Sequence, residues 1–201
     1  MKRTLIVFIL LCLFLCGCNQ LYYEPEQTVL ISAIGIDNAA NGVLLTVETV
    51  DTSSPDTGLE YSKKILESQS SDCQKAFLSL QKSLGNKLTA EHCAVVVKGV
   101  GVDKELLYKA LLFLGNSQNL SQNTKIVLAQ SANKMLKLKS RTGQAVGYDA
   151  VKILNMQNDK DLFLSCNFYS VLKALENKNS LTLPFFKTQN DSYFLDGVKN
   201  E

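Results

Sequence analysis

The sequence has little histidine, no nucleophile motif and no excess of charge of either sign. His92 is the single histidine, with Glu91 beside it, and no Gly-x-Ser-x-Gly elbow is present. One histidine without cysteine or histidine partners at ligand spacing is a weak metal signal. A nucleophile–histidine–acid arrangement assembled in space is the catalytic alternative that remains. We predict that the protein is not an enzyme and has no cofactor, and that His92 is a buried or capping residue.

The longest apolar run lies near the N-terminus and is too short to span a membrane. Met1-Lys2-Arg3 is basic, and residues 4–15 are almost uninterrupted apolar residues. A bilayer requires about 20 such residues, so an uncleaved membrane-spanning helix is the less favoured alternative. A short basic start followed by an apolar run is typical of a secretory signal peptide.

The end of this run, residues 15–18 (LCGC), resembles the bacterial lipobox. The resemblance implies that Cys18 is thioether-linked to diacylglycerol, that the leader is cut after Gly17, and that the new amine is often acylated. Two or three acyl chains anchor durably, since each buried methylene contributes about 0.8 kcal/mol. We expect a signal peptide over residues 1–17, a lipid-anchored tether over residues 18–27, and tethering to an outer membrane face.

Charge and cysteine content narrow the class of the mature protein. The leader removes two basic residues and no acid, which leaves 19 basic and 19 acidic residues. Net charge near zero argues against binding nucleic acid or an acidic membrane surface.

Three cysteines remain in the mature protein, Cys73, Cys93 and Cys166, and an odd number does not suggest a disulfide framework. Their apolar neighbours predict three buried thiols, with one bridge between Cys73 and Cys93 as the alternative.

Residue patterns after the tether predict a single domain over residues 28–201. Strands are predicted at residues 29–37, 43–50, 59–67, 93–97, 124–129, 181–186 and 193–198, and helices at residues 72–84, 103–114, 131–139, 148–156 and 167–176. The first two strands flank a turn-forming stretch and should form a hairpin. Helices and strands then alternate, which favours parallel strands. The predicted fold is α+β (mixed α/β), a mixed β-sheet with an N-terminal hairpin and helices packed on it.

Two polar motifs have structural rather than chemical explanations. Residues 99–101 (GVG) lie between a strand and a helix, where a phosphate loop would be, but lack a third glycine and a following Lys-Ser/Thr pair. We predict a tight turn with Asp103 capping the helix. Asp37, Asp51 and Asp56 lack the spacing of a calcium loop and are expected to be solvated turn carboxylates.

Two polar loops, residues 51–58 and 115–123, are candidate recognition sites, because adaptable loops on a rigid sheet commonly carry binding. The leucine-rich helix at residues 103–114 and the pair Phe185-Phe186 could present apolar surface to a partner. Most such stripes belong to the core, and that is what we expect here.

The order of these motifs resembles the Ger(x)C proteins, the lipoprotein C subunits of spore germinant receptors. After the lipobox cysteine, the resemblance rests on the paired segments AIGID (residues 33–37) and LTVE (residues 45–48). It continues with His92 leading into a buried strand (residues 92–97), and with the late segments LP (residues 183–184) and FLDGV (residues 194–198). Residues 115–119 (GNSQN) replace an Arg-containing acidic turn of that family. Family members typically carry further domains, so the resemblance implies the N-terminal domain, as a short or truncated form.

The resemblance implies a membrane-anchored subunit of a germinant receptor on the outer face of the spore inner membrane. Its partners would be the membrane-embedded A and B subunits, and its role in spore germination would be assembly of the receptor complex. Two alternatives come from other classes. A solute-binding lipoprotein of an envelope transporter needs two lobes around a cleft, and an envelope hydrolase would require His92.

Overall fold

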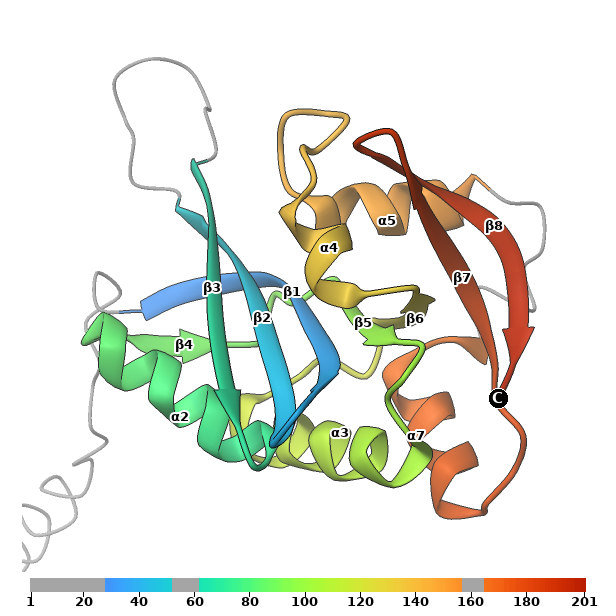
Figure 1. Cartoon of the computed structure of the whole chain (residues 1–201), viewed down its shortest axis with the longest axis horizontal. Coiled ribbons are helices and arrows are strands. Elements are labelled where there is room, and N and C mark those ends of the chain that lie inside the picture. Colours follow the sequence, from blue (N-terminus) through green and yellow to red (C-terminus); the bar gives the residue numbers. More distant parts are fainter. Residues whose placement is uncertain (1–27, 52–61, 157–164) are drawn as a thin grey trace, which may run out of the picture.

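The computed structural model describes residues 28–51, 62–156 and 165–201, which form a mixed β-sheet with helices on both faces (Figure 1). The strands are β1 (Thr28–Ala39), β2 (Gly42–Asp51), β3 (Ser62–Ser70), β4 (Lys87–Thr89), β5 (Val95–Gly99), β6 (Lys125–Ala129), β7 (Thr182–Gln189) and β8 (Ser192–Asn200). The helices are α2 (Cys73–Leu84), α3 (Lys104–Gln118), α4 (Ala132–Lys137), α5 (Val146–Asn155) and α7 (Phe168–Glu176). The predicted fold class is confirmed.

Strand order explains how the two halves of the chain share one sheet. The order is β3-β2-β1-β5-β6-β7-β8, and β4 pairs with the start of β1. Strands β1 and β2 form the predicted antiparallel hairpin, and β3 continues it. From β1 through β5 and β6 to β7 the strands are parallel, as the alternation of helices and strands predicts. The antiparallel β7–β8 hairpin completes the sheet.

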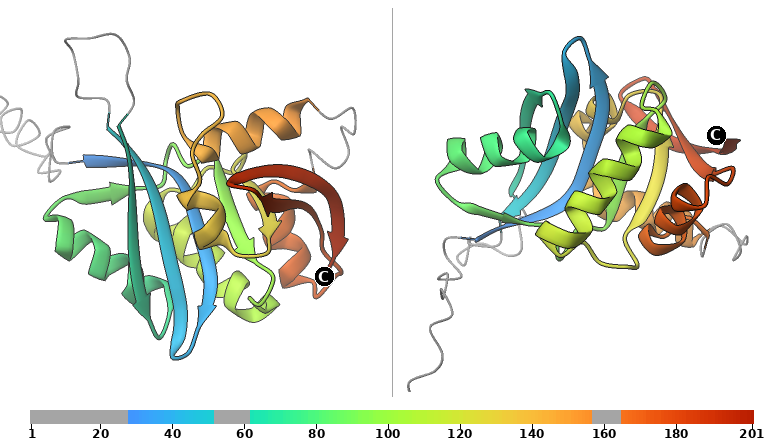
Figure 2. Two further views of the ribbon diagram at one scale, coloured as in Figure 1. Left: turned by 45° about the horizontal axis from the view of Figure 1, so that its top comes forward. Right: turned by 90° about the horizontal axis from the view of Figure 1, so that it is seen from below.

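Two apolar cores lie on opposite faces of the sheet. The helices that cover each face are seen in Figure 2. Helices α2, α3 and α7 cover one face, where Phe77 and Leu107 are fully buried. Helices α4 and α5 cover the other, around Met135 and Phe186. Strands β5 and β6 are buried along their whole length, since helices cover both sides of the central sheet. The apolar stripe of α3 and both residues of the pair Phe185-Phe186 belong to the core, as expected.

Several elements differ from the sequence-based expectation. Strand β5 begins at Val95, because Cys93 closes a turn in which its N–H bonds the carbonyl of Ala90 at 3.0 Å. Helix α3 runs on to Gln118, through the predicted loop start at Gly115. A side chain at Gly115 would meet the Phe168 ring at 2.7 Å, so glycine there permits the close approach of α3 and α7. The short strand β4 was not predicted, and residues 59–61 of the third predicted strand lie outside the described residues.

The C-terminal strand is tied to the centre of the sheet by an ion pair whose cation is fully buried. Lys98 on β5 is completely buried, and its ammonium contacts the carboxylate of Glu201. The backbones of Leu181 and Glu201 also exchange two hydrogen bonds, at 3.0 and 2.7 Å. Because a buried ammonium without a partner is strongly unfavourable, this pair fixes the end of β8 against β5.

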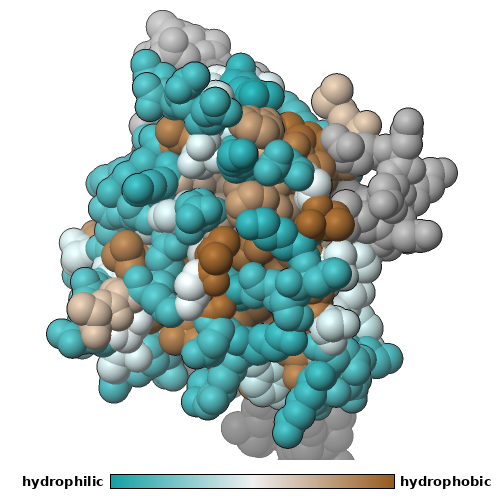
Figure 3. Space-filling view, turned by 45° about the vertical axis from the view of Figure 1, so that its right-hand side comes forward, coloured by the Kyte–Doolittle hydropathy of each residue, from teal (hydrophilic) through white to brown (hydrophobic). Residues whose placement is uncertain are grey.

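Figure 3 shows the side of the molecule formed by α5, β7 and β8. Apolar side chains reach the surface there but are interrupted by polar ones. The exposed large apolar residues on these elements include Val198 on β8, and Met156 at the end of α5 is exposed as well. Single exposed apolar side chains of this kind are normal on a soluble surface and by themselves identify no partner.

Candidate functional site

The predicted lipidation residue, Cys18, lies outside the described residues. The same is true of the signal peptide at residues 1–17, the tether at residues 18–27, and residues 52–58 of the first candidate recognition loop. These assignments remain predictions. Within the described ranges, none of the helices is long and apolar enough to cross a membrane.

Asp37, the last residue of the AIGID segment, caps a helix on a distant part of the chain. Its carboxylate accepts hydrogen bonds from the N–H groups of Ala132 and Asn133, at 3.0 and 2.7 Å, and from the hydroxyl of Ser131 at 3.3 Å. The prediction of a solvated turn carboxylate is therefore wrong for Asp37. A methyl group at Gly99 would lie 2.0 Å from this carboxylate, which explains glycine there.

Glu48, in the LTVE segment, has the same role for α5 and is fully buried. Its carboxylate accepts from the N–H groups of Val146 and Gly147, both at 2.9 Å, and from the hydroxyl of Ser32 at 2.8 Å. The ammonium of Lys63 lies 3.0 Å away. Residue 145, at the start of the helix, supplies no side-chain cap of its own. The two carboxylates of the N-terminal hairpin thus hold both helices of one face on the sheet.

Another carboxylate, the buried Asp149 on α5, organises the loop before its own helix. It accepts from Tyr193 Oη at 2.8 Å, from the hydroxyls of Ser140 and Thr142 at 2.8 and 2.5 Å, and from the N–H of Arg141 at 2.6 Å. Burial raises the pKa of Asp149, but the hydrogen bonds from Thr142, Ser140, Tyr193 and Arg141 lower it, and the net result is a lowered pKa. These contacts join α5 to β8.

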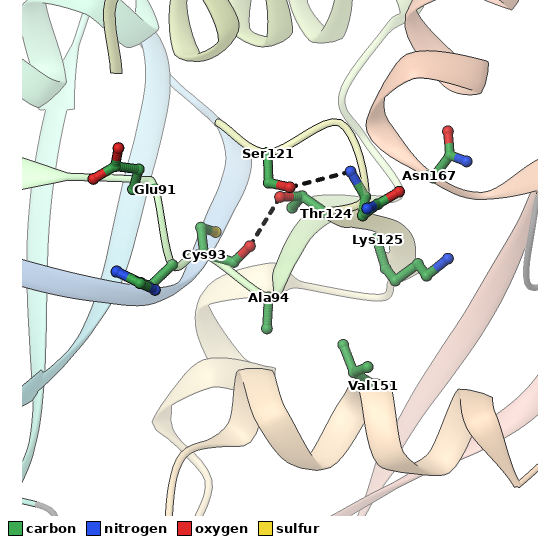
Figure 4. Close-up of a pocket in the computed structure, with 10 residues that line it drawn as sticks. Glu91, Cys93, Ala94, Ser121, Thr124, Lys125, Val151 and Asn167 are labelled. Carbon is green, nitrogen blue, oxygen red and sulfur yellow. Dashed lines mark hydrogen bonds between the residues drawn. The ribbon is translucent and has the colours of Figure 1, made fainter. Parts of the chain in front are cut away.

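A pocket of about 410 Å³ opens where β5 and β6 begin (Figure 4). Ala94, Val151 and the stem of Lys125 surround its apolar part, and polar groups of the 121–124 segment border the rest. Ser121 accepts the N–H of Asn123 at 3.3 Å. The hydroxyl of Thr124 donates to the carbonyl of Cys93 at 2.9 Å. The second candidate recognition loop, residues 115–123, therefore contributes to a pocket, although its first four residues belong to α3.

His92 also lines this pocket, but it is exposed and lies in a turn. His92 was predicted to be either buried or capping, and the buried alternative is wrong, because Glu91 and His92 are both exposed in the turn before β5. In the described part of the chain, no three His, Cys, Asp or Glu side chains are grouped so as to hold a metal ion. The geometry therefore gives His92 neither a metal-binding arrangement nor a buried structural role.

The three described cysteines are buried free thiols, as predicted. The alternative, a bridge between Cys73 and Cys93, is not formed. Burial, with a smaller contribution from the charge of Asp72, raises the pKa of the Cys73 thiol to about 12. Burial also raises the pKa values of Cys93 and Cys166. Thiols of this kind are poor nucleophiles, so a cysteine-based active site is not supported.

The segment 99–101 forms the predicted tight turn rather than a phosphate loop. The N–H of Val102 bonds the carbonyl of Gly99 at 3.0 Å, and the side chain of Asn38 donates to the carbonyl of Gly101. Asp103 caps α3 by accepting the N–H of Leu106 at 2.7 Å. The turn is thus closed by the protein's own groups.

Comparison with known families places these structural residues in context. The family model described as spore germination protein N-terminal domain matches residues 22–188. The chain belongs to this family. The matched segment of this spore germination domain includes both capping carboxylates, the pocket and seven of the strands, and ends in β7. No curated protein and no solved structure matches the chain.

Two structural roles in this spore germination domain were not predicted from the sequence. Asp37 and Glu48 lie in the two segments that carry the family resemblance, but their helix partners are about 100 residues away in sequence: Ala132 and Asn133, and Val146 and Gly147. The available signal was a carboxylate at an otherwise apolar strand position, as at Glu48. A buried acid in a strand requires partners, and helix N-termini are suitable ones.

Proposed function

We propose that this protein is a lipid-anchored, non-enzymatic subunit of a spore germinant receptor that contributes to assembly of the receptor complex. The observation that carries the proposal is the family match over residues 22–188, which begins four residues after the lipobox cysteine Cys18. The membrane-embedded A and B subunits are the proposed partners, at the outer face of the spore inner membrane. Germinant binding is shared with these subunits or made by them.

Lipidation gives a folded domain of balanced charge a place at the membrane. A residue carrying two or three acyl chains stays bound to the bilayer, whereas one chain binds reversibly. Confinement to a surface raises the effective concentration of the domain near membrane-embedded partners without any added contact. With near-zero net charge expected for the mature chain, assembly would depend on the anchor and on specific contacts rather than on general attraction to lipid.

The alternative of a transporter-type solute-binding lipoprotein has less support. Such a protein needs two lobes around a cleft, whereas the described residues share one continuous sheet with a core on each face. The hydrolase alternative also has less support, because the cysteine thiols of the described residues are buried and have raised pKa values, so they are not activated nucleophiles.

Two neighbouring cysteines allow a sharp test of the anchor. In sporulating cells, mass spectrometry of the N-terminal peptide should find diacylglycerol on Cys18, and Cys18→Ala should abolish both the modification and membrane retention. The matched control is Cys16→Ala, which should leave both unchanged. Spores carrying Cys18→Ala should germinate more slowly if anchoring serves the receptor. An unmodified Cys18 in a membrane-retained protein would contradict the proposal.

A further inference from the structure

Positive charge is concentrated on the face of the molecule covered by α4 and α5. Residues 132–155, which form these two helices and the loop between them, contain five cations and one acid. All five cations are exposed: Lys134, Lys137, Lys139, Arg141 and Lys152. The acid, Asp149, is buried, with 2% of its surface exposed. Although the charge of the mature chain is expected to balance, these five residues form a positive surface, the α4–α5 basic surface.

The nearby carboxylates neutralise little of this surface. Glu48 is fully buried, where it caps α5 and pairs with Lys63. Glu67, on β3, forms an ion pair with Lys137 at 2.8 Å. Among the ion pairs of residues 28–51, 62–156 and 165–201, this is the one that involves a cation of the α4–α5 basic surface. Four of the five cations are therefore available to an anionic partner.

The loop that carries Lys139 and Arg141 is held in place by the protein beneath it. Asp149 accepts hydrogen bonds from the hydroxyl of Ser140 at 2.8 Å and from the N–H of Arg141 at 2.6 Å. The guanidinium carbon of Arg141 lies 5.7 Å from the centroid of the Tyr193 ring. Figure 1 shows this loop projecting beyond α4 and α5. A loop that is already ordered loses little conformational entropy when it binds a partner.

The composition of the α4–α5 basic surface favours lipid over protein as its partner. Protein interfaces have an apolar core rich in aromatic residues. Of the exposed large apolar residues in the described ranges, only Met156, at the end of α5, adjoins this segment. Anionic headgroups need no apolar core, since each lysine or arginine near them strengthens binding about fivefold. The proposed anchor also favours lipid, because the tether at residues 18–27 spans at most about 36 Å and keeps the domain near the bilayer.

We propose that the α4–α5 basic surface binds anionic phospholipid headgroups and so determines which side of the domain faces the bilayer. The choice of lipid as the partner rests on the anchor in the proposed function. In this orientation helices α2, α3 and α7, which cover the opposite face of the sheet, are directed away from the bilayer. The anchor holds the protein at the membrane, and the basic surface orients it there.

Vesicle binding tests the proposal without the anchor. The full-length chain with Cys18→Ala, which has no acyl chain at this position, is mixed with vesicles of phosphatidylcholine or of phosphatidylcholine with anionic phosphatidylglycerol. Sedimentation gives a binding constant for each, and their ratio is the preference for anionic lipid. We expect a preference of at least about hundredfold that falls steeply as salt is added. Equal binding to the two kinds of vesicle would overturn the proposal, whereas the mass spectrometry of Cys18 tests the anchor separately.

Two matched triple variants separate the α4–α5 basic surface from overall charge, and each contains only exposed residues. The first neutralises three cations of this surface: Lys134→Gln, Lys139→Gln and Arg141→Gln. The second neutralises one cation on each helix of the opposite face: Lys82→Gln, Lys109→Gln and Lys173→Gln. Lys2 and Arg3, which also attract anionic lipid, are present in both.

The first variant should lower the preference for anionic lipid at least about tenfold, and the second by less than about threefold. Melting temperatures should remain close to that of the parent chain, because the changes are at the surface. If the first variant failed to fold, Lys139→Gln alone should still lower the preference about fivefold. Equal effects of the two triple variants would overturn the proposal, since binding would then follow net charge. An unchanged preference in the first variant would also overturn it, and co-purification would then show whether an acidic protein binds this surface instead.

Discussion

Replacement of Glu48 by glutamine tests whether a carboxylate on β2 holds α5 on the sheet. The side chain is fully buried and has four polar partners within 3.0 Å: two helix N–H groups, the hydroxyl of Ser32 and the ammonium of Lys63. Glutamine has nearly the same shape but no charge, and one of its two polar atoms is a donor facing other donors. The ammonium of Lys63 also loses its counter-ion, although it keeps the carbonyls of Leu136 and Leu138 at 2.6 and 2.7 Å.

The expected cost follows from these contacts. Removing one partner of a buried ion pair typically costs about 3–5 kcal/mol. Lys63 is 19% exposed and retains two carbonyl partners, so we expect the lower end, about 3 kcal/mol in the free energy of unfolding. For a domain of this size that corresponds to a melting temperature lower by about 6–12 °C.

Urea and thermal unfolding, followed by circular dichroism, measure this change. The matched control is Lys64→Gln, the exposed neighbour of Lys63 on the same strand, which should alter stability by less than about 0.5 kcal/mol. If Glu48→Gln cost less than about 1 kcal/mol, capping from β2 would not be what holds α5, and the reasoning would be refuted.

Three further changes test other parts of the fold. The pKa of Asp149 is lowered in the folded state. Its contribution to stability is therefore present above its unfolded pKa of about 3.9 and is lost as pH falls through the folded value. Asp149→Asn should remove this acid-dependent loss of stability and flatten the acid-unfolding curve in that pH range. Gly99→Ala should lower the free energy of unfolding by about 1–3 kcal/mol, since the new methyl group would lie 2.0 Å from the carboxylate of Asp37. Its control is Gly101→Ala, whose methyl group would have no contact under 3.7 Å and should be tolerated in the same unfolding assay. Glu201→Gln should cost about 3 kcal/mol by leaving Lys98 buried without its counter-ion, and adding Lys98→Met should restore part of the loss in a double-mutant cycle.

Periodicity and turn composition predicted most of the elements. The N-terminal hairpin, the parallel centre of the sheet and the amphipathic helices follow from local patterns, which depend only on neighbouring residues. Strand β4 was missed because three residues show no usable period, and it exists through pairing with the start of β1. The extension of α3 through Gly115 was missed because tertiary contact with Phe168 overrides the local tendency of glycine to end a helix.

Sites made by distant residues could not be predicted in this way. The partners of Asp37 and Glu48 depend on strand register and on the placement of α4 and α5, and neither is encoded in a local pattern. The pocket joins Ala94, Lys125 and Asn167 through two lines of backbone pairing, so sequence spacing gave no indication of it. The charge of Lys125 was hidden in a strand that reads simply as buried.

Co-purification from spore membranes tests the proposed receptor role most directly. The protein with a C-terminal tag is recovered from detergent-solubilised membranes, and its partners are identified by mass spectrometry. We predict that the membrane-embedded A and B subunits of a germinant receptor accompany it, that Cys18→Ala abolishes this, and that Cys16→Ala does not. Recovery of the lipidated protein alone, from membranes in which intact receptors are present, would contradict its proposed role in receptor assembly.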